Sequence, residues 1–232
     1  MNGERRDLEA SPHRCKSGCG QPTPWAEMRC EACTLRTQCA RRQARSVAKT
    51  SRALPARYRE MRLDGPELAR RVMDPEAIAL VRRACTSDTD RVVLVGPSGV
   101  GKTSLAAAAA IELSYQRSHV GAYVRAGSLA LARAHSALGA EALLVQQVLA
   151  ADLLVVDDLG LDPQGHHSAV ADVLYQRYDE CKTTIVTTSL TDAETSGRYG
   201  TGVARRLFEA VDSALVLQLK PQTTRPRVFG AP

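Results

Sequence analysis

Eight consecutive residues near the middle of the chain fit the phosphate-binding pattern G-x-x-x-x-G-K-[ST]. Glycines let the backbone wrap around phosphate groups, and successive amide N–H groups converge on the anion at the start of the following helix. Lys102 is placed to supply charge to the β- and γ-phosphates, and the Thr103 hydroxyl to bind Mg²⁺. The sequence therefore predicts a Mg·ATP site built from Gly96, Pro97, Ser98, Gly99, Val100, Gly101, Lys102, Thr103 and Ser104.

The position of this loop between two expected elements strengthens the prediction. An apolar run over 91–95 precedes it, as expected of a strand buried on both faces, and an alanine-rich stretch over 103–117 that favours helix follows it. Strand, loop and helix in this order are the context that a phosphate-binding loop requires. The alternative, a glycine turn that binds no ligand, fits this context less well.

Two carboxylates stand at the end of a second apolar run. Asp157 and Asp158 directly follow the predicted buried strand over 153–156. In an open α/β sheet, ligands bind at the carboxyl ends of the strands. We expect Asp157 to hold Mg²⁺, directly or through a water molecule, and Asp158 to orient or deprotonate the attacking water. A turn or helix-capping role for the pair is the alternative.

A cluster of cysteines lies near the N-terminus, apart from Cys85 and Cys181, which fall in predicted apolar elements. Four of them form two closely spaced pairs, a layout typical of a structural zinc site with four thiolate ligands. A short segment poor in apolar residues has little besides a metal to fold it. Cys39 is a spare thiol, His13 could replace one thiolate, and unliganded thiols are the alternative. The predicted zinc ligands are Cys15, Cys19, Cys30 and Cys33.

Strands and helices are predicted to alternate around these residues. Asp74 is the expected N-cap, and Pro75 the first residue, of the helix before the first strand. The alternation indicates an α/β fold with a five-stranded parallel sheet covered by helices on both faces, and the polar stretch after 187 is expected to be a loop. Predicted strands span 91–95, 120–124, 153–156, 183–187 and 214–219, and predicted helices 75–85, 103–117, 128–138, 141–150, 169–181 and 203–211.

Charge is spread unevenly along the 232 residues. Residues 1–83 carry 18 Lys and Arg against 10 Asp and Glu, whereas the whole chain has a net charge of +6. Most of this excess lies between Arg36 and Arg62, a cluster that contacts nucleic-acid phosphates or an acidic partner, or is a solvated basic linker. The predicted segments are a cysteine-rich zinc-binding domain (1–45), a basic linker and lead-in (46–74), an ATPase domain (75–220) and a C-terminal tail (221–232).

The sequence offers no candidate for membrane insertion. No apolar run reaches the roughly 18–20 residues that a span needs, and the first residues are charged rather than signal-like. We therefore expect a cytoplasmic protein without membrane contact. In that compartment cysteines serve as metal ligands or free thiols rather than as disulfides.

Four segments together resemble one family of nucleotide-binding proteins. The chain over roughly 54–219 resembles the AAA+ ATPases of the DnaC/IstB-like family, which comprises replicative helicase loaders and insertion-sequence transposition helpers. The resemblance implies a P-loop NTPase fold, ATP hydrolysis at a site shared between subunits of a homo-oligomer, and DNA with a replicative helicase or a transposase as partners. The segments are Leu54-Pro55-Ala56-Arg57-Tyr58, Val95 to Ala106, Asp157-Asp158-Leu159-Gly160 and Ala204-Arg205-Arg206-Leu207.

The resemblance also implies roles for residues outside the loop. Ser189 stands where the family usually has a sensor-1 asparagine that probes the γ-phosphate, and Thr188 can share this task. Arg206 matches the arginine finger that contacts the ATP of a neighbouring subunit, and Arg205 can substitute for it. For both arginines a solvated helix face is the alternative. The cysteine cluster resembles the zinc-bearing N-terminal domains with which some loaders hold their partner.

The sequence leaves several functions open. Helicase loading and transposition help are not separable within the leading interpretation. An ATP-dependent adaptor with slow or no hydrolysis is an alternative, because Asp158 replaces the glutamate of many AAA+ sites and Ser189 replaces the usual asparagine. A small-molecule kinase is a further alternative, although no substrate pocket or arginine-bearing lid is evident.

Overall fold

A computed structural model of the chain describes residues 13–25, 27–135, 142–163, 165–209, 211 and 213–220. The chain divides into two compact units, Met1–Arg45 and Ser46–Pro232, and each is considered by itself. The predicted tail at 221–232 and the predicted helix boundaries near 138–141 lie outside the described residues. Within the described ranges, no helix is long and apolar enough to cross a membrane.

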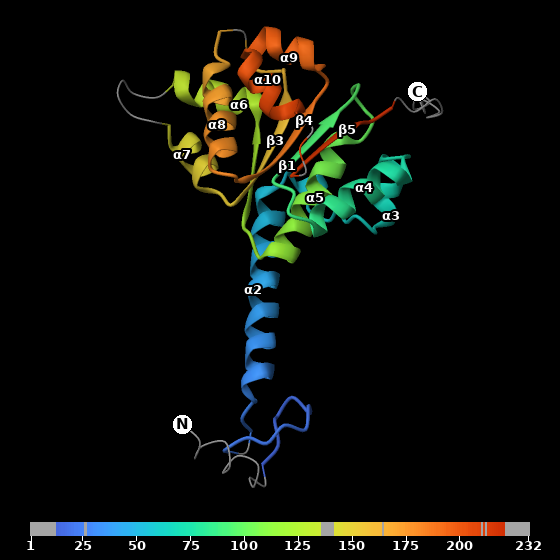
Figure 1. Ribbon diagram of the computed structural model, residues 1–232, viewed down its shortest axis with the longest axis vertical. Coiled ribbons are helices and arrows are strands. Elements are labelled where there is room, and N and C mark those ends of the chain that lie inside the picture. The colour runs from blue at the N-terminus through green and yellow to red at the C-terminus, as the bar shows by residue number, and fades with distance from the viewer. Residues whose placement is uncertain are drawn as a thin grey trace, which may run out of the picture. The chain divides into compact units, whose positions relative to one another are not determined.

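A five-stranded sheet forms the centre of the second unit (Figure 1). Its strand order is β2-β3-β4-β1-β5, and all pairings are parallel. β1 lies between β4 and β5, with Val93 opposite Val186 on one side and Val216 on the other. The predicted parallel sheet is therefore confirmed. Its strands are β1 (Arg91–Val95), β2 (Gly121–Arg125), β3 (Leu153–Leu159), β4 (Thr183–Thr188) and β5 (Ala214–Gln218).

Helices cover both faces of this sheet, as predicted. In β1, Val92 and Leu94 belong to one apolar core, whereas Val93 and Val95 belong to another. The first core includes α4 and α5, and the second includes α6, α7, α8 and α10 (Figure 1). The helices are α4 (Pro75–Thr86), α5 (Lys102–Arg117), α6 (Ala126–Ala134), α7 (Leu143–Ala150), α8 (Ser168–Asp179) and α10 (Thr201–Phe208).

Some local structure differs from the sequence prediction. α9 (Asp192–Tyr199) occupies the stretch expected to be a loop, and it begins with a capping box between Thr191 and Glu194. α3 (Pro66–Arg71) and a 3-10 turn at Ala56–Tyr58 form within the predicted linker. β3 also continues beyond its predicted end, to Leu159, with an irregular register against β4. The two aspartates therefore lie in the last part of the strand rather than after it.

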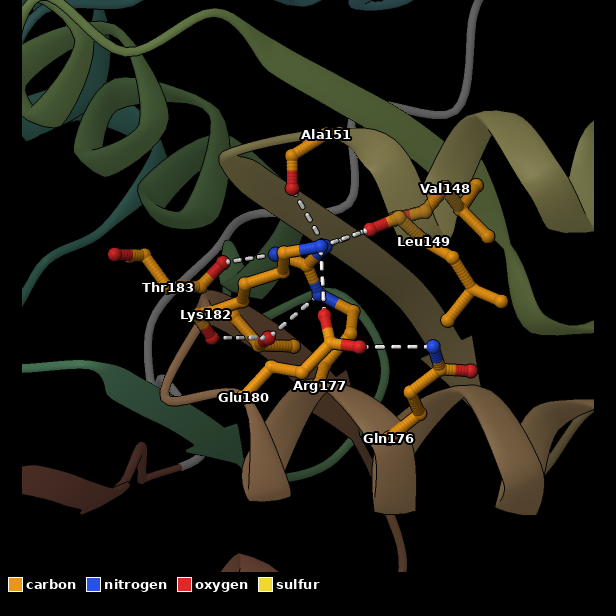
Figure 2. Close-up of polar contacts among 9 residues, drawn as sticks. Val148, Leu149, Ala151, Gln176, Arg177, Glu180, Lys182 and Thr183 are labelled. Carbon is orange, nitrogen blue, oxygen red and sulfur yellow. Dashed lines mark hydrogen bonds and ion pairs between the residues drawn. The ribbon is translucent and has the colours of Figure 1, made fainter.

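A buried guanidinium joins α7, α8 and β4, as Figure 2 shows. Arg177 of α8 is fully buried and donates hydrogen bonds to the carbonyl oxygens of Val148 and Ala151, at 2.8 and 2.7 Å. It also donates to the carbonyl oxygen of Thr183 at 2.7 Å. Carbonyl groups at the end of a helix have no partner within that helix. Arg177 supplies these partners at the end of α7, and burial lowers its pKa to about 10.

The first unit is described from His13 onward, and it contains the cysteine cluster. An isolated antiparallel bridge joins Arg14 to Pro22, and the Cys15 N–H donates to the Gln21 carbonyl at 2.9 Å. α2 (Glu31–Ala53) begins directly after the third cysteine of the cluster. The part of α2 from Ser46 onward belongs to the second unit.

Candidate nucleotide-binding site and cysteine cluster

The phosphate-binding loop connects β1 to α5, and two of its glycines are required by the backbone. Gly96 has a φ of 150° and Gly101 a φ of 97°, which are angles that favour glycine. A Cβ at Gly96 would lie 2.5 Å from the Leu219 carbonyl oxygen, and one at Gly101 would lie 2.7 Å from that of Arg71. Both fixed glycines of the motif therefore allow close approach of neighbouring backbone.

Lys102 is the first residue of α5, and its ammonium group turns back toward the loop. Nζ donates to the carbonyl oxygens of Gly96 and Pro97, at 2.6 and 2.9 Å. Burial lowers the pKa of Lys102, while the negative charges of Asp158 and Asp157 act in the opposite direction. A cation is thus held at the loop where phosphates are predicted to bind.

A cavity of about 390 Å³ opens beside the loop. Besides loop residues, its lining includes Arg57, Tyr58, Arg71 and Asp158. The guanidinium carbons of Arg57 and Arg71 lie 5.5 and 5.9 Å from the centre of the Tyr58 ring. This wall is aromatic and cationic, which suits a nucleotide with its phosphates. The predicted loop residues that line the cavity are Ser98, Gly99, Gly101, Lys102, Thr103 and Ser104.

Asp157 is buried at the centre of a hydrogen-bond network that ties three strands to the loop. Its Oδ1 accepts from the hydroxyl of Thr103 in α5 at 2.9 Å and from that of Thr187 in β4 at 2.6 Å. Its Oδ2 accepts from the hydroxyl of Tyr123 in β2 at 2.7 Å. The structure therefore brings together the two residues predicted to hold Mg²⁺, Thr103 and Asp157.

Asp158 has a different environment from its neighbour. It lines the cavity, and its φ of 58° is rare for a residue with a side chain. Its N–H donates to the Thr187 hydroxyl at 3.0 Å. Burial, and then the charge of Asp157, raise the pKa of the Asp158 carboxyl group. Strained backbone of this kind is concentrated at functional sites.

The residues predicted to act as the γ-phosphate sensor do not face the cavity. Ser189 is exposed, and neither it nor Thr188 is among the residues that line the cavity. The buried Thr188 hydroxyl donates to the Leu159 carbonyl at 2.8 Å and accepts from the Leu190 N–H at 3.0 Å. The hydroxyl at this strand end that reaches the acidic pair belongs to Thr187, which donates to the Asp157 carboxylate and accepts from the Asp158 backbone N–H.

The two arginines of α10 differ in what they contact. The Arg206 guanidinium carbon lies 4.6 Å from the centre of the Tyr175 ring and 5.1 Å from that of Tyr178, both on α8. The Arg205 side chain is 77% exposed, and its charged contact is Glu209 at 3.6 Å. Neither arginine lines the cavity of its own chain. Arg206 therefore packs α10 onto α8, and Arg205 is the arginine that faces solvent.

The four cysteines predicted to bind zinc are brought together in the first unit. Their Sγ atoms all lie within 4.8 Å of one another, and those of Cys19 and Cys30 are 3.5 Å apart. Tetrahedral zinc with bonds of about 2.3 Å separates its sulfur ligands by roughly 3.8 Å, so this donor set fits the ion. The Cys30 N–H donates to the Cys15 sulfur at 3.3 Å and lowers the pKa of the Cys15 thiol to about 6. Cys39 is exposed and stands outside the set.

Sheet order, loop, acidic strand end and cavity together define a P-loop nucleotide-binding protein of the AAA+ type. Residues 19–209 match the family of IstB-like ATP binding proteins, and the chain belongs to this family. The resemblance predicted from the sequence is thus confirmed. Among curated proteins, none matches the sequence of this chain.

Solved structures with a similar fold include a helicase loader and a replication initiator. The DnaC helicase loader is 24% identical, with a TM-score of 0.58 over 72% of this chain and 100% of that one. DnaI is 20% identical, with a TM-score of 0.53 over 69% and 94% of the two chains. AMPPCP-bound DnaA from Aquifex aeolicus is 20% identical, with a TM-score of 0.52 over 69% and 50%. At these identities the similarity concerns the fold.

Several residues of the site were not predicted from the sequence. Tyr123 and Arg71 lie in segments whose apolar or charged pattern gives no sign of a nucleotide site, whereas Thr187 directly precedes the predicted sensor residues Thr188 and Ser189 but was not itself given a role. Tyr123 and Thr187 come close to Asp157 because of the order and register of the strands. Arg71 comes close to the phosphate-binding loop because its backbone at the end of α3 lies beside Gly101. Tyr58 is different, because the family resemblance of the lead-in implies a position near the adenine, with a packing role as the alternative.

Proposed function

We propose that this protein hydrolyses Mg·ATP at a site completed by a neighbouring subunit, and that the ATP state controls its action on a DNA-processing partner. That partner is a replicative helicase or a transposase. One observation carries the proposal: Asp157 is buried and bonded to Thr103, while Asp158 next to it faces the cavity with Lys102. A fixed carboxylate and a cavity-facing one suit metal binding and water activation, respectively.

The residues in and beside the cavity have different roles in hydrolysis. Lys102 and the loop amides hold the β- and γ-phosphates, and Tyr58 contacts the base. Thr103 and Asp157 hold Mg²⁺, which neutralises phosphate charge when bound. Asp158 orients the water that attacks the γ-phosphate, and its raised pKa makes it a stronger base than an ordinary aspartate.

A neighbouring subunit supplies the arginine that stabilises the transition state. The family resemblance assigns this role to Arg206, but the contacts favour Arg205. Arg206 already packs against Tyr175 and Tyr178 of its own chain, whereas the Arg205 side chain is 77% exposed. To reach a second subunit, Arg205 would give up its exposed contact with Glu209, whereas Arg206 would give up its contacts with two tyrosine rings.

The first unit and α2 provide the contacts to partners. The cysteine cluster binds zinc through Cys15, Cys19, Cys30 and Cys33, which have the geometry of a closed structural site. The basic residues of α2 are exposed and free to neutralise phosphates of single- or double-stranded DNA. They are Arg36, Arg41, Arg42, Arg45, Lys49 and Arg52.

The ATPase proposal is tested with purified protein, with and without single-stranded DNA. We expect measurable hydrolysis for the wild type, and loss of both ATP binding and hydrolysis for Lys102→Ala. Lys220→Ala changes an exposed lysine outside the cavity and is the matched control. Retention of ATP binding by Lys102→Ala would contradict the assignment of the loop.

The shared site is tested by mixing two inactive variants. Lys102→Ala cannot hold ATP but keeps its α10 arginines, and Arg205→Ala has an intact loop. If the site is shared, the mixture regains activity that neither variant has alone. The same mixing experiment with Arg206→Ala in place of Arg205→Ala shows which of the two arginines completes the site. Because either arginine could substitute for the other, full activity of the double variant Arg205→Ala/Arg206→Ala at every protein concentration would rule out a finger from this helix.

A slow-turnover adaptor is the second candidate function. Ser189 is exposed and Thr188 is bonded to backbone, so no sensor hydroxyl of this pair faces the cavity. If the protein is an adaptor of this kind, Asp158→Asn leaves partner binding and the ATP dependence of that binding unchanged. If hydrolysis matters, the same variant is trapped in its ATP-bound state and holds the partner.

A further inference from the structure

Tyr123 lies next to the predicted metal-binding carboxylate, although it comes from a different strand. In the parallel pairing of β2 with β3, Tyr123 stands beside Val155, two residues before Asp157. Its ring is partly buried, and its hydroxyl donates to Asp157 Oδ2 at 2.7 Å.

The count of acceptor positions shows what this hydrogen bond does. A carboxylate offers about four lone-pair directions. Thr103 and Thr187 occupy the two directions of Oδ1, and Tyr123 occupies one of the two on Oδ2. No other residue in the described part of the chain donates to Asp157, so the fourth direction is left for a metal ion or its bound water. With a donor on each side, the carboxylate is also prevented from rotating.

We propose that Tyr123 is a positioning residue for Mg²⁺, which orients Asp157 so that its free lone pair faces the ion bound with the nucleotide. The inference rests on the proposed function, because it assumes a Mg·ATP site at the loop. Residues that hold a metal ligand in place from outside the coordination shell typically change metal affinity by about 10–100-fold when they are removed. Tyr123 is not among the residues that line the cavity.

The test measures nucleotide binding as a function of Mg²⁺ concentration, with a fluorescent ATP analogue and no requirement for turnover. Tyr123→Phe removes the hydroxyl and keeps the ring. Tyr123→Leu removes the same hydroxyl with a differently shaped side chain, so the two variants share only the loss of the donor. Tyr115→Phe, at a tyrosine that is 51% exposed, is the matched control. Thermal unfolding of each variant verifies its fold.

We expect the Mg²⁺ concentration for half-maximal binding to rise about tenfold in both Tyr123 variants, with binding in EDTA unchanged. The shift should disappear when Asp157→Asn is already present, because the effect acts through Asp157. An unchanged Mg²⁺ curve would overturn the inference, and so would equal weakening with and without Mg²⁺ or a shift that persists in Asp157→Asn. If the wild type shows no Mg²⁺-dependent nucleotide binding, the proposed function itself fails.

Discussion

At the scale of single residues, two adjacent carboxylates are prepared for different tasks by their surroundings. Three hydroxyl groups hold Asp157, whereas Asp158 has a strained backbone and a raised pKa. Protonated Asp158 cannot accept a proton from water, so hydrolysis should be lost as the pH falls through its pKa. Because this pKa is raised above 3.8, the loss should occur at a higher pH than for an ordinary aspartate.

This prediction is checked by the turnover rate at saturating ATP across the acidic range, with nucleotide binding followed in parallel. Asp158→Asn should lower the rate by about 100-fold and remove the acidic pH dependence. Asp88→Asn, at an exposed aspartate, should behave like the wild type. A variant at Asp158 that keeps the wild-type rate and pH profile would favour the adaptor function instead.

Substitution of the two arginines of α10 should also have different effects on the stability of the protein. Arg206→Ala removes its contacts with two tyrosine rings, and we expect it to lower the free energy of unfolding by about 1 kcal/mol. Arg205→Ala removes an exposed side chain and should change stability by less than about 0.5 kcal/mol. Thermal or urea unfolding measures both. Equal stability of the two variants would contradict the packing role of Arg206.

At the scale of elements, the corner between α7, α8 and β4 depends on Arg177. Arg177→Met fills a similar volume but leaves the carbonyl groups of Val148, Ala151 and Thr183 without this donor (Figure 2). We expect a loss of about 2–4 kcal/mol in urea unfolding, because buried acceptors without partners are costly. Arg83→Met, at an exposed arginine of α4, is the control. A change under about 1 kcal/mol at Arg177 would show that water replaces these contacts.

The elements also show why sequence predicts some features and not others. Strands such as β1 are buried on both faces, so their apolar runs are visible in the sequence. α9 is short and polar, and its signal was the Thr191 and Glu194 capping box rather than an apolar face. The acidic pair at the end of β3 and the phosphate-binding loop can be predicted from local sequence patterns. The Tyr123 contact cannot, because it depends on β2 lying beside β3 with a defined register.

At the scale of the whole molecule, a nucleotide-binding unit and a cysteine-bearing unit form one chain. The ATP cavity is lined by residues of the second unit alone. The cluster of Cys15, Cys19, Cys30 and Cys33 lies entirely in the first. Each unit therefore holds the residues that we expect to bind its own ligand, and loss of one ligand should leave the other site able to bind.

This independence gives a prediction for zinc. Cys19→Ser removes one of four ligands and should abolish stoichiometric zinc, whereas Cys39→Ser, outside the cluster, should retain it. Zinc content per chain is measured on the purified proteins. The single tryptophan, Trp25, lies in the first unit, so its fluorescence reports on that unit. We expect strong chelators to change Trp25 fluorescence in the wild type, because metal binding supplies folding energy in short segments with little apolar core.

Nucleotide binding is then the second readout of the same samples. Cys19→Ser and chelated wild type should bind the fluorescent ATP analogue as tightly as untreated protein, because the cavity contains no residue of the first unit. Full zinc content in Cys19→Ser would show that the ligand set is wrong. Loss of nucleotide binding together with zinc would instead show that the metal supports the second unit as well, and that the two sites are coupled.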